Sequence, residues 1–68
     1  MKIFYEGAPK DEETEAKVKA IVDGIGDEGH DYVIGIDYAS KHSKDYTAVA
    51  KFKKNKDGIL TLENIEYI

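Results

Sequence analysis

The chain has 68 residues, no cysteine and a formal net charge of −4. A chain this short forms one small domain, which buries only about 60% of the surface that its unfolded state exposes. Disulfide bonds are excluded, and no cluster of cysteine and histidine residues is present to build a structural zinc site. Because neither cross-link is available, a surface for self-association, and hence a homo-oligomer, is an expected source of stability.

The first part of the chain predicts an extended segment followed by a helix. Residues 1–10 begin with a short apolar and aromatic run, which is typical of an edge strand or of an arm packed on the core. Residues 11–24 predict a helix, because acidic residues crowd its first turn and Gly24 offers a natural end. Its apolar residues recur with helical spacing and form one stripe. The stripe consists of Val18, Ile21, Val22 and Ile25.

The second part, residues 32–67, predicts a β-meander. Residues 32–38 are an uninterrupted β-branched and apolar run, which predicts a strand covered on both faces. In residues 46–53 the type of side chain alternates from one residue to the next, which predicts a strand whose two faces have different surroundings. A hairpin turn is expected at residues 55–58. The last strand changes phase near Glu63–Asn64, which predicts either a β-bulge or a strand that is buried on both faces at its end.

Together these elements predict a single α+β domain over residues 1–68. One helix packs on a three-stranded antiparallel β-meander, and residues 1–10 form either a fourth short strand or an arm. The absence of an apolar run of about 18 residues, and of an apolar leader at the N-terminus, predicts a cytoplasmic protein with no membrane partner.

Charge is segregated along the chain. Residues 1–37 carry −6, residues 38–56 carry +5 and residues 57–68 carry −3. A basic middle segment could meet nucleic-acid phosphates or an acidic protein. It could equally be a solvated lysine-rich hairpin, since lysine on an edge strand discourages aggregation.

Three pieces of the meander form a pattern that is found in a known family. Gly35 to Ala39 (Gly-Ile-Asp-Tyr-Ala) is followed, after a polar loop, by Asp45 to Ala50 (Asp-Tyr-Thr-Ala-Val-Ala) and by Lys56 to Leu60 (Lys-Asp-Gly-Ile-Leu). Over residues 32–67 the chain resembles the opening β-meander of the ribonuclease H-like nuclease domain of phage terminase large subunits.

The resemblance implies a role for Asp37 but no complete active site. Asp37 matches the first of at least three acidic residues that hold two divalent metal ions in that family. The remaining acidic residues of the family lie far downstream, beyond the part that this chain resembles. Two-metal phosphodiester cleavage needs several converging carboxylates, so the resemblance does not imply catalysis by this chain alone.

Two candidate sites follow from the residues around the polar loop. Asp37 and Asp45 flank the loop and could hold a divalent cation, or could cap the loop through backbone hydrogen bonds. The loop itself, with the lysines that follow it, could bind phosphate or nucleic acid, or could be solvated without a ligand. These candidates are Ser40, Lys41, His42, Ser43, Lys44, Lys51, Lys53, Lys54 and Lys56.

Aromatic residues of the meander leave a further alternative open. They could stack nucleic-acid bases if several share an open sheet face, or they could form the core beneath the helix. The residues concerned are Tyr32, Tyr38, Tyr46, Phe52 and Tyr67.

The sequence thus predicts a small interaction module without enzymatic activity, a phage or prophage accessory protein of the host-cell cytoplasm that binds a protein partner or nucleic acid. No cofactor is expected. The alternative is a nuclease-related subunit that contributes Asp37 to a composite Mg²⁺ or Mn²⁺ site formed with another chain. The metal-binding alternative predicts cation binding that is lost in Asp37→Ala.

Overall fold

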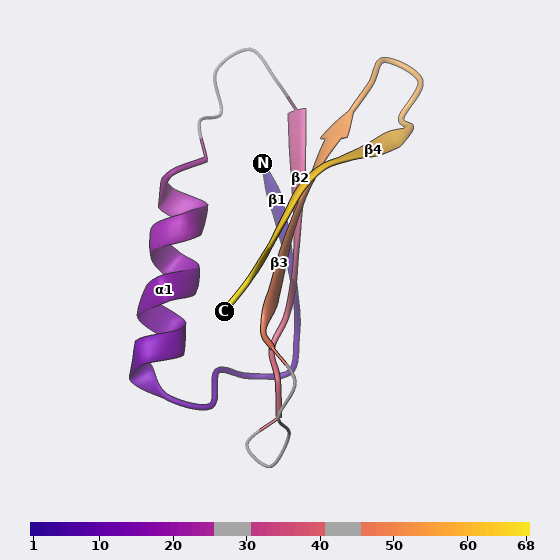
Figure 1. Cartoon of the computed structure of the whole chain (residues 1–68). Helices are drawn as coiled ribbons and strands as arrows, with labels where there is room; N and C mark the ends of the chain where they lie inside the picture. The colour runs from indigo at the N-terminus through magenta and orange to yellow at the C-terminus, as the bar shows by residue number, and fades with distance from the viewer. Residues whose placement is uncertain (26–30, 41–45) are drawn as a thin grey trace.

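The fold is a four-stranded mixed sheet with one helix on one of its faces (Figure 1). The computed structural model describes residues 1–25, 31–40 and 46–68. Within them the sheet order is β1-β2-β3-β4, with β1 parallel to β2 and the other neighbours antiparallel. The elements are β1 (Lys2–Glu6), α1 (Glu12–Asp23), β2 (Asp31–Asp37), β3 (Ala48–Lys54) and β4 (Leu60–Tyr67).

The predicted α+β class is confirmed, and the meander gains a fourth strand. Residues 1–10 contain an edge strand, β1, that pairs in register with β2 from Lys2 opposite Val33 to Glu6 opposite Asp37. The pairing is parallel because α1 carries the chain back along the sheet before β2 begins, as a crossover between parallel strands requires. The strands of the predicted meander, β2, β3 and β4, are antiparallel, and the parallel pair formed by β1 makes the sheet mixed.

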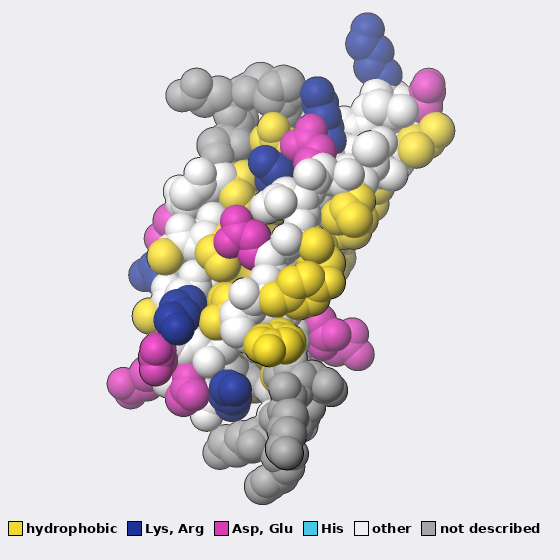
Figure 2. Space-filling view, viewed as in Figure 1, with side chains coloured by type: hydrophobic (Ala, Val, Ile, Leu, Met, Phe, Trp, Pro, Cys, Tyr) yellow, Lys and Arg dark blue, Asp and Glu magenta, His cyan; other side chains and the backbone are white. Residues whose placement is uncertain are grey.

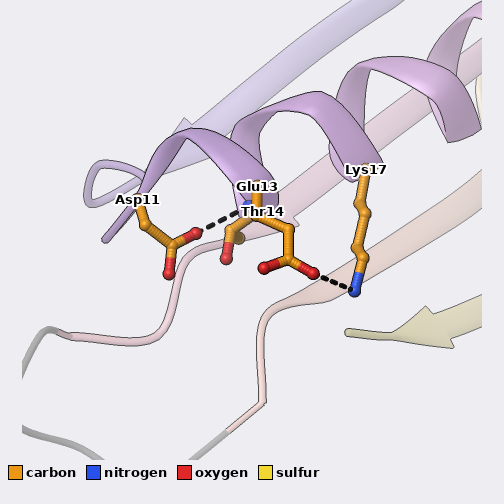
Figure 3. Close-up of polar contacts among 4 residues, drawn as sticks. All are labelled: Asp11, Glu13, Thr14 and Lys17. Carbon is orange, nitrogen blue, oxygen red and sulfur yellow. Dashed lines mark hydrogen bonds and ion pairs between the residues drawn. The ribbon is translucent and has the colours of Figure 1, made fainter.

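Local side-chain interactions explain where α1 begins (Figure 3). The Asp11 carboxylate accepts a hydrogen bond of 2.7 Å from the backbone N–H of Thr14, which satisfies one of the free donors of the first turn. Glu13 and Lys17, one helical turn apart, form an ion pair with 3.1 Å between the carboxylate and the ammonium. Gly24 ends the helix as expected, but with a φ of −78° and not in a left-handed conformation.

The hydrophobic core lies between α1 and the sheet. Val18, in the middle of the predicted helical stripe, is buried, and the other three residues of the stripe are partly buried beside it. Ile34 is fully buried at the centre of the sheet. The helical stripe is thereby confirmed as the surface that packs on the sheet. The buried cluster consists of Val18, Tyr32, Ile34, Ile36 and Val49.

The expectation that β2 is covered on both faces is wrong. Tyr32, Ile34 and Ile36 are buried, whereas Val33 and Gly35 between them are only half-buried. Alternate residues of a strand point to opposite faces, so one face of β2 is covered and the other is not. The physical reason is that α1 packs on one face, and no described helix or strand lies on the other (Figure 1).

The predicted turn and bulge that shape β3 and β4 are both confirmed. Gly58 takes a φ of +81°, which favours glycine, and the Asn55 backbone N–H donates to the Ile59 carbonyl at 3.0 Å. Farther along, the register shifts between Lys51 and Phe52, so that Glu63 is the extra residue that the pairing of β4 with β3 skips.

Thr47, the residue just before β3, is buried and links β3 to the ends of β2 and β4. Its backbone exchanges hydrogen bonds with Ile68 at 3.2 and 2.8 Å. Its hydroxyl oxygen accepts a hydrogen bond of 3.1 Å from the backbone N–H of Ala39. Thr47 therefore holds together the chain after β2, the start of β3 and the end of β4.

Candidate interaction surface

The sheet face opposite α1, here called the open face, is the candidate functional surface. Residues directly opposite each other on neighbouring strands point to the same side, so the register identifies its members. They are Lys2, Phe4 and Glu6 of β1; Asp31, Val33, Gly35 and Asp37 of β2; Ala48, Ala50, Phe52 and Lys54 of β3; and Leu60, Leu62, Ile65 and Tyr67 of β4.

Most of the open face is apolar and accessible to solvent. Phe4 is 61% exposed, Leu62 52% and Tyr67 63%, and Leu60 and Ile65 are exposed as well. Figure 2 shows hydrophobic side chains gathered in a continuous row along the molecule. A solvated sheet face ordinarily carries polar residues in alternation with the core residues. A continuous apolar face of this kind is typical of a surface that binds another macromolecule.

A shallow hollow lies on the open face, from the middle of the sheet to the end that carries Glu6 and Asp37. It has a volume of about 420 Å³ and is lined by Phe4, Ala48, Ala50 and Ile65 around Gly35. Gly35 has no side chain to fill this space. A Cβ added to it would meet only the Phe52 ring edge, at 3.9 Å. The hollow has room for a side chain of a binding partner.

Charged residues lie at the two ends of the apolar area. At one end, here called the acidic end, Glu6 and Asp37 are opposite each other on β1 and β2. At the other, here called the basic end, Lys54 lies opposite Asp31, and Lys2 lies opposite Val33, two residues further along β2. The open face therefore has net charges of opposite sign at its two ends.

The lysines predicted to form one basic surface are divided between two faces of the sheet. Lys51 and Lys53 lie opposite Ile34 and Tyr32 and so point to the helix side. Lys54 belongs to the open face. The Lys51 ammonium is 3.6 Å from the Glu63 carboxylate and 4.9 Å from the centre of the Tyr32 ring, so its charge is already partly compensated. Lys56 is exposed in the hairpin turn.

The remaining predicted site residues are placed only in part. Ser40 is exposed just after β2, whereas the candidates at 41–44 and Asp45 lie outside the described residues. Asp37 is exposed at the end of β2, and its neighbour is Glu6, a residue that the sequence did not single out. Within the described part of the chain, no group of three acidic or histidine residues is close enough together to hold a metal ion.

The aromatic residues also separate by face. Tyr32 belongs to the core, and Tyr38 is half-buried on the helix side, where its ring stacks on Tyr5 with 6.1 Å between ring centres. Burial raises the pKa of the Tyr38 hydroxyl. Phe52 and Tyr67 lie on the open face.

A second hollow, of about 560 Å³, lies between α1 and β1. Its walls are formed by side chains that also support the core, such as Ile3, Val18 and Val22, together with the stacked Tyr5 and Tyr38. It is a groove at the margin of the core, and it lacks the continuous exposed apolar area of the open face.

The sequence-based interpretation considered an open sheet face only for the aromatic residues, and it missed the exposed apolar area that β1 and β4 form there. A signal for this area was present. Leu60 and Leu62 point to the same side of the sheet as Phe52, and the apolar Val33 points to the side opposite Ile34. Both facts were compatible with a strand covered on two sides.

No described helix is both long and apolar enough to cross a membrane.

Comparisons of the chain with protein-family models, with curated proteins and with solved structures give no match.

Proposed function

We propose that this chain is a non-catalytic interaction module that binds a protein partner through the open face. The observation that carries the proposal is the exposed apolar area of β1 and β4, represented by Phe4, Leu62 and Tyr67. Removing apolar surface from water contributes roughly 25 cal/mol per Å², so covering this face stabilises the complex. The resemblance of residues 32–67 to a phage terminase nuclease segment supports a phage or prophage accessory protein.

A protein is a better fit to this surface than nucleic acid. Binding to phosphates depends on clustered cations, and the described lysines are divided between two faces. If nucleic acid were the partner, a short DNA duplex at low salt would shift the amide resonances of Lys51, Lys53 and Lys56 together. We expect no such concerted shift.

Site-specific photo-crosslinking tests the proposal with an internal control. Phe4 and Tyr5 are neighbours on β1 that point to opposite faces, and they are similarly exposed, at 61% and 58%. Replacing Phe4 with benzoylphenylalanine in cells that produce the protein should give protein adducts, identified by mass spectrometry. The same replacement of Tyr5 should give none.

Adducts formed equally well from both positions, or from neither, would refute binding through the open face. Adding Leu62→Lys to the Phe4 replacement gives a further check. A lysine in the apolar area should abolish the adducts while the circular dichroism spectrum stays unchanged, because Leu62 is exposed and its loss leaves the core intact.

A second candidate function is a composite divalent-metal site. It is favoured by one observation, the position of Glu6 directly opposite Asp37 on adjacent parallel strands. Two carboxylates are fewer than a two-metal site needs, so a partner chain would supply the rest. Mn²⁺ should then broaden the amide resonances of Glu6 and Asp37, and Asp37→Asn, but not Asp57→Asn, should abolish the broadening.

A further inference from the structure

The distribution of charge on the open face identifies a partner. Building on the proposed function, we propose that the open face is covered by a second copy of this chain. The two sheets pack face to face, with their strands antiparallel across a two-fold axis that lies between the sheets and runs perpendicular to the strands. The product is a symmetric dimer with α1 on each outer side.

Charge distinguishes this arrangement from the other two-fold packing of the same faces. An axis along the strands would place the acidic end of one copy on the acidic end of the other, which is unfavourable. An axis perpendicular to the strands places the acidic end, Glu6 and Asp37, against the basic end, where the two lysines Lys2 and Lys54 outnumber Asp31. Charge pairs at the rim of an interface contribute little affinity, but they select orientation.

Side-chain size fits the same arrangement. The central row of the open face contains Gly35 and Ala50, which are small enough to let two sheets approach. On β3, Phe52 lies two positions from Ala50 on one side and Ala48 two positions on the other. Reversing the strands therefore places the Phe52 ring of each copy over Ala48 of the other, a large residue on a small one.

The area of the open face is sufficient for a dimer of moderate affinity. Four strands spaced by about 4.8 Å, with about seven residues rising 3.4 Å each, project roughly 450 Å² per copy. Protruding side chains increase the accessible area above this projection. The interface falls near the lower limit of stable protein–protein interfaces, which predicts a dissociation constant on the order of micromolar.

Pairing of two β4 edges is the competing way to join two copies. The bulge at Glu63 interrupts the hydrogen-bonding register of β4, and bulges of this kind hinder pairing between sheet edges. Edge pairing would also leave the open face exposed to water. Face-to-face packing covers it.

Charge-reversal variants test the arrangement by sedimentation equilibrium of the purified protein. Lys2→Glu with Lys54→Glu makes both ends acidic, and Glu6→Lys with Asp37→Lys makes both ends basic. Each variant alone should weaken dimerisation by about tenfold or more, because like charges then meet at both ends of the interface. An equimolar mixture should restore it as a heterodimer.

A control variant separates these effects from net charge. Asp57→Lys with Glu66→Lys changes the net charge as much as the second variant does, but at the hairpin turn and on the helix side of β4. Its dimerisation should match that of the wild type. A mixture of the two reversed variants that stays monomeric, or reversed variants that dimerise like the wild type, would overturn the proposed arrangement.

Mapping the Phe4 crosslink distinguishes the two-fold axes directly. In the proposed dimer β1 lies over β1 of the second copy, so the adduct should map to residues 1–6 of that copy. An adduct on β4 would indicate the axis along the strands and contradict the proposal. A wild-type protein that is monomeric at about 1 mM refutes the dimer alone, whereas the proposed function still stands if Phe4 forms adducts with another protein.

Discussion

At the start of α1, a single hydrogen bond links local structure to pH. The Asp11 carboxylate accepts from the backbone N–H of Thr14, and this hydrogen bond holds the pKa of the carboxyl below its usual range. A carboxyl whose pKa is lowered by folding stabilises the folded state above its unfolded pKa of about 3.9. The stabilisation is lost as the pH falls through the lower pKa of the folded state.

Removing this carboxylate should therefore destabilise the protein at neutral pH and have little effect in acid. Asp11→Ala should lower the Tm by roughly 5 °C at pH 7, because an N-cap is lost from a small domain. The difference from the wild type should shrink below about pH 4. Asp11→Ser keeps a capping oxygen that does not titrate, so its Tm should exceed that of Asp11→Ala at every pH. A constant difference between wild type and Asp11→Ala from pH 7 to pH 2 would contradict this account.

The centre of the core is the position at which a small change should unfold the protein. Ile34 is 0% exposed, so Ile34→Ala should cost about 2–5 kcal/mol of the free energy of unfolding. A domain of this size has only about 3–10 kcal/mol in total. The matched control is Ile59→Ala, at an exposed position, which should cost less than about 0.5 kcal/mol. Urea denaturation of both variants measures the difference, and similar losses would place the core elsewhere.

Among the elements, the sheet depends on one buried hydroxyl. Thr47→Val conserves the shape of the side chain but leaves the backbone N–H of Ala39 without its acceptor. The expected loss is about 1–3 kcal/mol, the cost of an unsatisfied buried donor. Thr47→Ser retains the oxygen and should be less destabilising than Thr47→Val. If valine were as stable as threonine in urea denaturation, the hydrogen bond would not hold these segments together.

For the whole molecule, strand position in the sheet predicts resistance to hydrogen exchange. β2 and β3 are hydrogen-bonded on both sides, whereas β1 and β4 are edges. Amides of β2 and β3 should exchange at least about tenfold more slowly than those of β1 and β4 in dilute protein. A face-to-face dimer preserves this ranking as concentration rises. Selective protection of β4 at high concentration would indicate pairing between sheet edges instead.

The outcome at β2 explains why sequence patterns predicted some features and not others. An apolar run such as residues 32–38 is typical of a strand between two layers, and Val33 is apolar in sequence whether or not anything covers it. Whether a layer covers the side of Val33 depends on which face of the sheet the one predicted helix packs on. Tertiary packing decides this, because α1 covers the side of Ile34 and leaves the side of Val33 open.

The sequence by itself determined the features that depend on neighbours along the chain. These are the helix with its Asp11 cap, the turn at Gly58 and the bulge at Glu63, which follow from hydrogen bonds and backbone preferences within a few residues. The tertiary structure alone decided the parallel pairing of β1 with β2, the meeting of Glu6 with Asp37, and the exposure of one sheet face. These contacts join residues about thirty positions apart, and their existence depends on how α1 and the sheet divide one small core between them.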